Sequence, residues 1–162
     1  MKFSAHFCKA EFEGHDQIPE GALPCFIEMC ERILEQIRSR FNAPVVITSG
    51  YRSPEHNAAV GGKHTSQHIA SAEHCACDFK IPGVEIELVF DWIRLDSNLR
   101  FDQLILEHNA WGELASVIHI SYTRQKARRE ALEGLTHGRS HYIARTVGHH
   151  PIAENPELWG EA

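Results

Sequence analysis

The sequence contains no long hydrophobic run. No apolar stretch in its 162 residues approaches the roughly 18 residues that a membrane-spanning helix requires. The first six residues, from Met1 to His6, lack the apolar segment of a secretory signal peptide. The sequence therefore predicts a chain without a membrane span that remains in the cytoplasm as synthesised.

Cysteine is too scarce and too irregularly spaced to form a covalent framework. The chain has five cysteines, an odd number: Cys8, Cys25, Cys30, Cys75 and Cys77. No pair has the Cys-x-x-Cys spacing of thiolate zinc sites. This argues against both a disulfide framework and a zinc cluster held by sulfur. We expect reduced, buried thiols instead.

The sequence also lacks an excess of positive charge. Lysine and arginine number 16 against 22 aspartates and glutamates, which leaves a formal net charge of -6. A dedicated nucleic-acid-binding protein would carry the opposite sign, so no nucleic-acid partner is predicted. One local basic run is expected to be the solvated face of a helix: Arg124, Lys126, Arg128 and Arg129.

Apolar residues are abundant enough for one core. A hydrophobic content of 43% in 162 residues suits one globular domain, and no repeat or linker divides the chain. We predict a single domain over 1–162, with its core over about 20–123 and a C-terminal part, 124–162, that consists of a helix and an irregular tail. Nothing in the sequence indicates an oligomer, and we expect a monomer.

Apolar spacing predicts an α+β fold. Positions that recur every three or four residues indicate amphipathic helices over 21–40 and 84–95. Ser53 followed by Pro54 predicts the start of a shorter helix, because serine caps a helix and proline fits its first turn. Short or alternating apolar runs predict strands at 45–48, 75–81, 102–107 and 117–121. We expect a small, mostly antiparallel sheet with flanking helices, in which the last two strands form a hairpin.

Three polar residues have the composition of a catalytic zinc site. Cys77 and Phe79 face the core on their strand, so Asp78 points to the other side, and the same alternation turns His119 away from the core. With His68, two imidazoles and one carboxylate come from separate segments. A working zinc site needs three such ligands and one position for water. We predict one zinc ion per chain at His68, Asp78 and His119.

Short sequence words in a fixed order resemble a known family. They are Val46–Ser53, Asn57–Gly62, Thr65–His68, Ala76–Phe79, Phe101–Ile105 and Ile118–Ser121. In this order they resemble the zinc D-alanyl-D-alanine carboxypeptidases and phage endolysins, whose fold is shared with the vancomycin-resistance D,D-dipeptidases and the hedgehog signalling domain. The resemblance implies a zinc peptidase that cuts peptidoglycan stem peptides, as a carboxypeptidase or an endopeptidase. A phage endolysin would be released to the cell wall without a signal peptide.

The resemblance also assigns roles to residues of this chain. It implies that the same three residues bind zinc, and that Arg52 binds a substrate carboxylate or stabilises the developing oxyanion. A guanidinium suits this role because it stays charged and offers a planar set of donors. Ser66 and Gln103 are implied to line the substrate site.

The loop between the first two ligands departs from the family pattern. Asp78 lies ten positions after His68, three more than in the pattern Ser-x-His-x-x-Gly-x-Ala-x-Asp, and the glycine is missing. His74 lies in this longer loop and would face the same side as Asp78 on a continuous strand, so it is the alternative ligand. We favour His68 because Ser66-Gln67-His68 matches the Ser-x-His start of the family pattern. The longer loop also closes at little extra entropic cost.

The catalytic base departs from the pattern as well. Many relatives carry a carboxylate three residues before the last histidine, where this chain has Ser116. Glu107 and Glu113 are the candidates to accept the proton of the attacking water, and we favour Glu107 because its strand would hold it more rigidly. If neither carboxylate approaches the metal, the chain is a catalytically inactive, zinc-stabilised module that binds cell wall or belongs to a phage structure.

Overall fold

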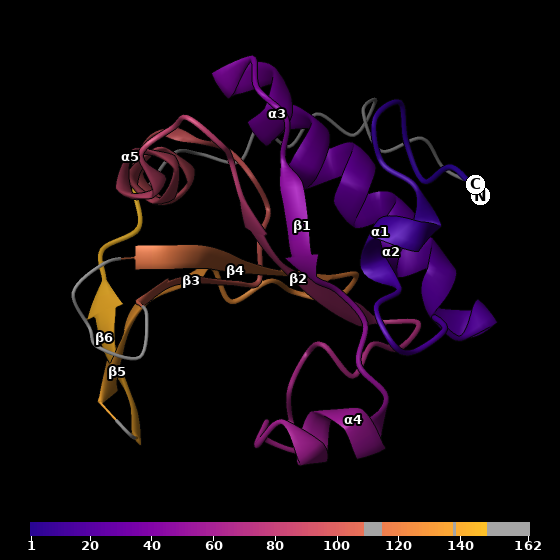
Figure 1. Ribbon diagram of the computed structural model, residues 1–162. Helices are drawn as coiled ribbons and strands as arrows, with labels where there is room; N and C mark the ends of the chain where they lie inside the picture. The colour runs from indigo at the N-terminus through magenta and orange to yellow at the C-terminus, as the bar shows by residue number, and fades with distance from the viewer. Residues whose placement is uncertain (109–114, 138, 149–162) are drawn as a thin grey trace.

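The computed structural model describes residues 1–108, 115–137 and 139–148. Within these ranges, six strands form one sheet in the order β1-β2-β4-β3-β5-β6 (Figure 1). All neighbouring strands are antiparallel except β3 and β5, which are parallel. The strands are β1 (Val46–Ser49), β2 (His74–Lys80), β3 (Gln103–His108), β4 (Ala115–Thr123), β5 (Glu130–His137) and β6 (Arg139–Arg145). The predicted α+β class and the mostly antiparallel sheet are confirmed.

The helices lie on both sides of this sheet. The long helix predicted near the N-terminus runs through η1 (Glu20–Ala22), α2 (Leu23–Met29), the π-helical turn η2 (Cys30–Leu34) and α3 (Glu35–Phe41). It ends where Asn42 adopts a left-handed conformation with φ 47°. The other helices are α1 (Lys9–Phe12), α4 (Pro54–Ala59), α5 (Ile86–Asp91) and the π-helical turn η3 (Trp92–Asp96). Figure 1 shows α2, α3 and α5 on one side of the sheet and α4 on the other.

The hydrophobic core fills the space between the long helix and one face of the sheet. Phe26 and Ile33 of the helix and Phe79 and Ile118 of the sheet are completely buried. Removing each of these side chains from water contributes about 1.5–3 kcal/mol. The N-terminal segment joins the same core, because the Phe12 ring packs 5.4 Å from that of Phe26, centroid to centroid.

The cysteines and the helices agree with the sequence-based expectations. All five cysteines are free thiols, and four of them are buried. Cys8 is the partly exposed one. Among the described residues, no helix combines the length and the apolar character needed to cross a membrane.

The expected C-terminal helix and irregular tail were wrong for the described residues. Residues 124–129 form a connection without helix, and the chain then continues in β5 and β6. Local propensity favours a helix for such a sequence of Arg, Ala, Glu and Leu, but β5 pairs with the free edge of β3. This pairing buries Ala131, which is 3% exposed, in the core. Tertiary pairing has therefore overridden local preference.

Candidate metal centre

His68 lies in the connection between α4 and β2 and is fixed from two sides. Its backbone carbonyl accepts a hydrogen bond from the Arg52 amide at 3.0 Å, and its ring nitrogen Nδ1 donates to the Gly50 carbonyl at 2.6 Å. Because a carbonyl only accepts hydrogen bonds, Nδ1 carries a proton, and Nε2 is the ring nitrogen available to a metal ion. The imidazole is thus oriented as a metal ligand requires.

Asp78 and His119 are direct neighbours on adjacent strands. The antiparallel register of β2 and β4 pairs these two residues. Cys77 and Ile118, one position away on each strand, are completely buried in the core. The predicted alternation is confirmed, because Asp78 and His119 lie together on the opposite face of the sheet.

The two histidines and the aspartate bring three possible ligand atoms to one point. His68 Nε2 lies 3.2 Å from Asp78 Oδ1 and 3.1 Å from His119 Nδ1. His119 Nδ1 lies 2.9 Å from Asp78 Oδ1. In the part of the chain that the structure describes, this is the only group of three or more His, Cys, Asp or Glu residues arranged to hold a metal ion. All three residues are buried.

The geometry and charge of this group suit zinc. Tetrahedral zinc ligands at roughly 2.0–2.2 Å from the ion lie about 3.3–3.6 Å from one another, a few tenths of an ångström more than the observed 2.9–3.2 Å. Burial by itself would raise the pKa of Asp78, but hydrogen bonds and charges from His119 and His68 hold that pKa well below its usual range. The carboxylate is therefore ionised at neutral pH. Three protein donors leave a fourth position for water or substrate.

Arg52 and Glu107 lie beside the group. The Arg52 guanidinium donates from Nη2 to Asp78 Oδ2 at 3.1 Å, and from Nη2 and Nε to Ser49 Oγ at 2.9 and 3.2 Å. Glu107, on β3, lines the same cleft. Burial and the nearby negative charge of Asp78 raise the pKa of Glu107. The cleft thus combines a fixed cation with a carboxylate that takes up a proton more readily than an exposed glutamate does.

The alternative ligand His74 is not part of the group. Its Nδ1 lies 3.1 Å from Ser71 Oγ, and its Nε2 lies 3.2 Å from the Ile69 carbonyl. Both ring nitrogens are therefore engaged at the start of β2. The structure brings His68, rather than His74, to Asp78. The alternative base Glu113 lies outside the described residues.

The remaining predicted residues surround the cleft. Ser66 and Gln103 both line it. Ser66 Oγ accepts a hydrogen bond from the His68 amide at 3.4 Å, and Gln103 Nε2 donates to Glu130 Oε2 at 2.6 Å. Ser116, where relatives often carry a carboxylate, is exposed.

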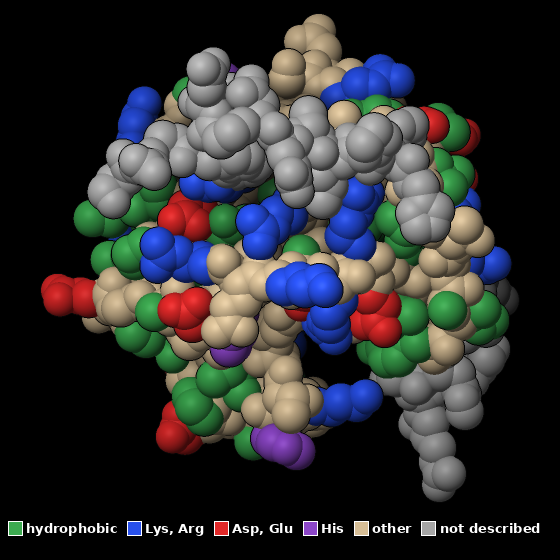
Figure 2. All heavy atoms as spheres, turned by 180° about the vertical axis from the view of Figure 1, so that it is seen from behind, with side chains coloured by type: hydrophobic (Ala, Val, Ile, Leu, Met, Phe, Trp, Pro, Cys, Tyr) green, Lys and Arg blue, Asp and Glu red, His purple; other side chains and the backbone are tan. Residues whose placement is uncertain are grey.

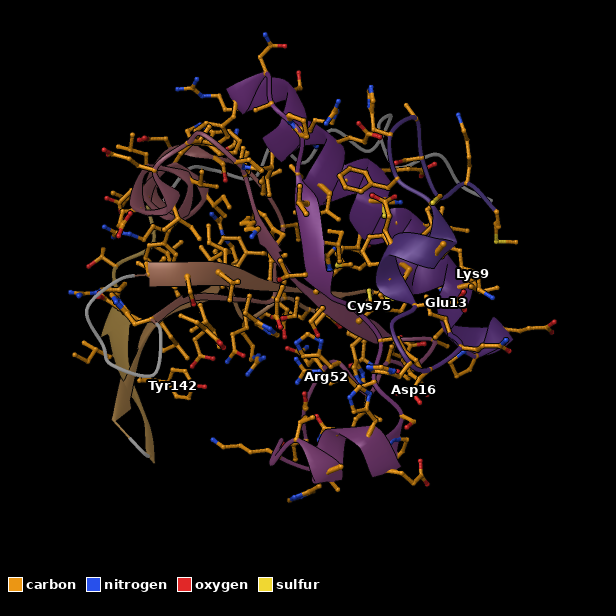
Figure 3. The ribbon with its side chains drawn as sticks, viewed as in Figure 1. Lys9, Glu13, Asp16, Arg52, Cys75 and Tyr142 are labelled. Carbon is orange, nitrogen blue, oxygen red and sulfur yellow. The ribbon has the colours of Figure 1, made fainter. Side chains whose placement is uncertain are left out.

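The cleft has a volume of about 440 Å³ and three cationic side chains in its lining, Arg52, Lys63 and Arg128. On the face shown in Figure 2, the surface is hollowed beside Lys and Arg side chains. Figure 3 shows Arg52 between the sheet and α4. The group of His68, Asp78 and His119 therefore lies in a cleft whose lining contains both cationic and acidic side chains, the acidic ones being Asp78, Glu107 and Glu130.

Sequence reasoning missed a buried carboxylate that connects the walls of the cleft. Asp102, 4% exposed, accepts hydrogen bonds from Gln67 Nε2 at 2.8 Å and from Arg128 Nη2 at 2.7 Å. Arg128 Nη2 also donates to Gln67 Oε1 at 3.2 Å. Arg128 was expected on a solvated helix face, and no local pattern indicates a partner 26 residues away.

The fold and this site together define a class of protein. An α+β sheet that presents two histidines and an aspartate in a cleft, beside an arginine and a glutamate, has the arrangement of a metal-dependent hydrolase. The family model described as Peptidase M15 matches residues 5–121, and the chain belongs to this peptidase family. A comparison with curated proteins gave no match. The predicted resemblance is confirmed at the level of the peptidase family.

Proposed function

We propose that this chain is a zinc-dependent peptidase that hydrolyses peptidoglycan stem peptides. The observation that carries the proposal is the convergence of His68 Nε2, Asp78 Oδ1 and His119 Nδ1 within hydrogen-bonding distances. These three atoms would hold the zinc ion. When bound, the ion would polarise the scissile carbonyl and lower the pKa of the attacking water.

Glu107 is the proposed general base. It accepts a proton from the attacking water and then returns that proton to the leaving amine. Its raised pKa, caused first by burial and then by the charge of Asp78, favours uptake of a proton from the attacking water. Its position on β3 holds it in the cleft.

Arg52 is the proposed electrostatic partner of the substrate. Its side chain is held by Ser49 and Asp78, so it needs little reorganisation when negative charge develops on the carbonyl oxygen. The same guanidinium also matches a substrate carboxylate. Peptidoglycan stem peptides carry such carboxylates, and the presence of Arg52 and Lys63 in the cleft lining supports substrates of this kind.

The test compares Glu107→Gln with Glu113→Gln in zinc-loaded protein. Loss of a general base lowers the rate by about 10²–10⁴-fold, so Glu107→Gln should abolish release of peptides from purified cell wall while zinc content stays at that of the wild type. Glu113→Gln should keep its activity. A wild-type protein that holds zinc and binds cell wall without releasing product would instead support the inactive binding module.

A further inference from the structure

The face of the sheet that carries the metal-binding group continues well beyond it. Strand register places Asp78 beside His119, His119 beside Ile105, Ile105 beside Leu132, and Leu132 beside Ala144. These residues form one row across five strands. Neighbours in register project to the same face of a sheet, so the row runs from the metal group to the edge strand β6.

The far end of this face combines apolar, aromatic and cationic side chains. Leu132 and Tyr142 line the cleft, and Tyr142 is 40% exposed. Across the cleft, the Lys63 ammonium lies 5.8 Å from the centroid of the Tyr142 ring. This end therefore offers an apolar surface, an aromatic ring and a positive charge.

A glycine positions the Tyr142 ring. Gly134 is the partner of Tyr142 in the register of β5 and β6, and a Cβ atom at Gly134 would lie only 3.0 Å from Tyr142 Cε1. The ring thus covers the glycine, as aromatic side chains do opposite glycine in paired strands. Figure 3 shows Tyr142 projecting from β6 on the side of the sheet where Arg52 lies. In Figure 1, β5 and β6 extend toward the side of the sheet where α4 lies, and Leu132 of β5 and Tyr142 of β6 line the cleft.

The length of this face can be compared with that of a peptide. Adjacent strands lie about 4.8 Å apart, so the three steps from β4 to β6 span about 14 Å. An extended peptide rises about 3.3 Å per residue. The face between the metal group and β6 thus accommodates about four residues of an extended chain.

We propose that this face is an extended substrate subsite, which ends at Tyr142 and Lys63 and holds about four residues on one side of the scissile bond. The inference rests on the proposed function and adds to it a subsite and the kind of substrate residue that the subsite takes. The occupant of the far end is a residue that bears a carboxylate on an alkyl side chain, because Lys63 attracts the charge while Leu132 and Tyr142 contact the carbons. The protein then prefers a whole stem peptide to a free dipeptide. Leu132 and Tyr142 both lie outside the residues matched by the family model, 5–121.

The experiment measures binding without cleavage. Zinc-loaded Glu107→Gln protein is titrated calorimetrically with a five-residue stem peptide, with truncations from each end, and with D-alanyl-D-alanine. The full peptide should bind at least about tenfold more tightly than the dipeptide, because one aromatic contact and one partly desolvated ion pair each contribute to affinity. Adding Tyr142→Ala should remove about tenfold of this affinity. Adding Lys63→Gln should weaken binding and reduce its dependence on salt concentration.

Two control variants keep the result specific. Ile143→Ala changes the next residue of β6, which is 45% exposed and points to the opposite face, so affinity should not change. Tyr142→Phe keeps the ring and should retain most of the affinity.

The outcomes separate the two proposals. Equal affinity for pentapeptide and dipeptide, or equal losses in Tyr142→Ala and Ile143→Ala, overturns the subsite even if the wild type hydrolyses cell wall. Binding of the pentapeptide that depends on Tyr142, in a protein whose wild type hydrolyses nothing, supports the subsite and contradicts the peptidase. The truncation that loses affinity shows which side of the scissile bond the subsite holds.

Discussion

At the scale of single residues, the backbone carbonyl of Gly50 orients the imidazole of His68. The Gly50 carbonyl fixes the proton on His68 Nδ1, so the lone pair of Nε2 faces Asp78 and His119. A side chain at Gly50 is excluded, since its Cβ would lie 2.4 Å from the Phe12 carbonyl oxygen. The N-terminal segment therefore contributes to the site through its backbone.

The choice between the two candidate histidines gives the prediction at this scale. His68→Ala should lower the zinc content from about one equivalent per chain to near zero, because only two ligands remain. His74→Ala should retain zinc, since its ring nitrogens contact Ser71 and Ile69. The measurement is elemental analysis of both variants after identical dialysis against zinc. Retention of zinc by the first variant and its loss from the second would make His74 the ligand.

At the scale of elements, Asp102 connects three segments that are distant in sequence. It precedes β3 and accepts hydrogen bonds from Gln67, next to His68, and from Arg128, before β5. Burial would raise the pKa of Asp102, but the hydrogen bonds from Arg128 and Gln67 and the charge of Arg128 lower that pKa overall. The folded state therefore favours the ionised form.

This arrangement predicts a stability that depends on pH. Asp102→Asn should lower the free energy of unfolding at pH 7 by about 1–3 kcal/mol, because charged hydrogen bonds to a buried group are lost. Since folding lowers the pKa of Asp102, its contribution is fully present above the unfolded-state pKa of about 3.9 and is lost as the pH falls through the folded-state value. Urea titrations at several pH values measure both effects. The difference between wild type and variant should shrink in acid.

Asp91→Asn is the matched control for this prediction. The Asp91 side chain is 51% exposed and pairs with Arg94 one helical turn away. Such surface pairs contribute about 0–1 kcal/mol. Equal effects of the two substitutions at pH 7 would contradict the proposed role of Asp102 as a connection between segments.

At the scale of the whole molecule, the two faces of the sheet have different roles. One face packs against the long helix and α5 and forms the core, while the other carries the cleft. A metal ion in the cleft would connect three separate parts of the chain: the connection after α4, β2 and β4. Anything that binds only the folded state stabilises it.

Metal removal is the prediction at this scale. Chelation followed by dialysis should lower the melting temperature, and added zinc should restore it, because a ligand present at a hundredfold its Kd stabilises the folded state by about 2.7 kcal/mol. Differential scanning calorimetry measures the change. The melting temperature of His119→Ala should not respond to zinc. An equal response in the wild type and in His119→Ala would mean that zinc binds elsewhere.

The sequence predicted the features that depend on local order. Three- and four-residue spacing predicted a helix over 21–40, which the structure has from Glu20 to Phe41, and alternation placed Asp78 and His119 on one face. The resemblance then supplied His68, Arg52 and the peptidase family. Each of these predictions needed only neighbouring residues or words in a fixed order.

By itself, then, the sequence determined the helices between Glu20 and Asp96, the central strands, the face of the sheet on which Asp78 and His119 lie, and the peptidase family. Only the tertiary structure decided that residues after 129 extend the sheet, that Asp102 binds Arg128, and that His68 rather than His74 meets Asp78. The physical reason is the separation along the chain of the residues that interact. Periodicity is a property of adjacent residues, whereas the partner of an edge strand or of a buried charge depends on which distant segments the fold brings into contact.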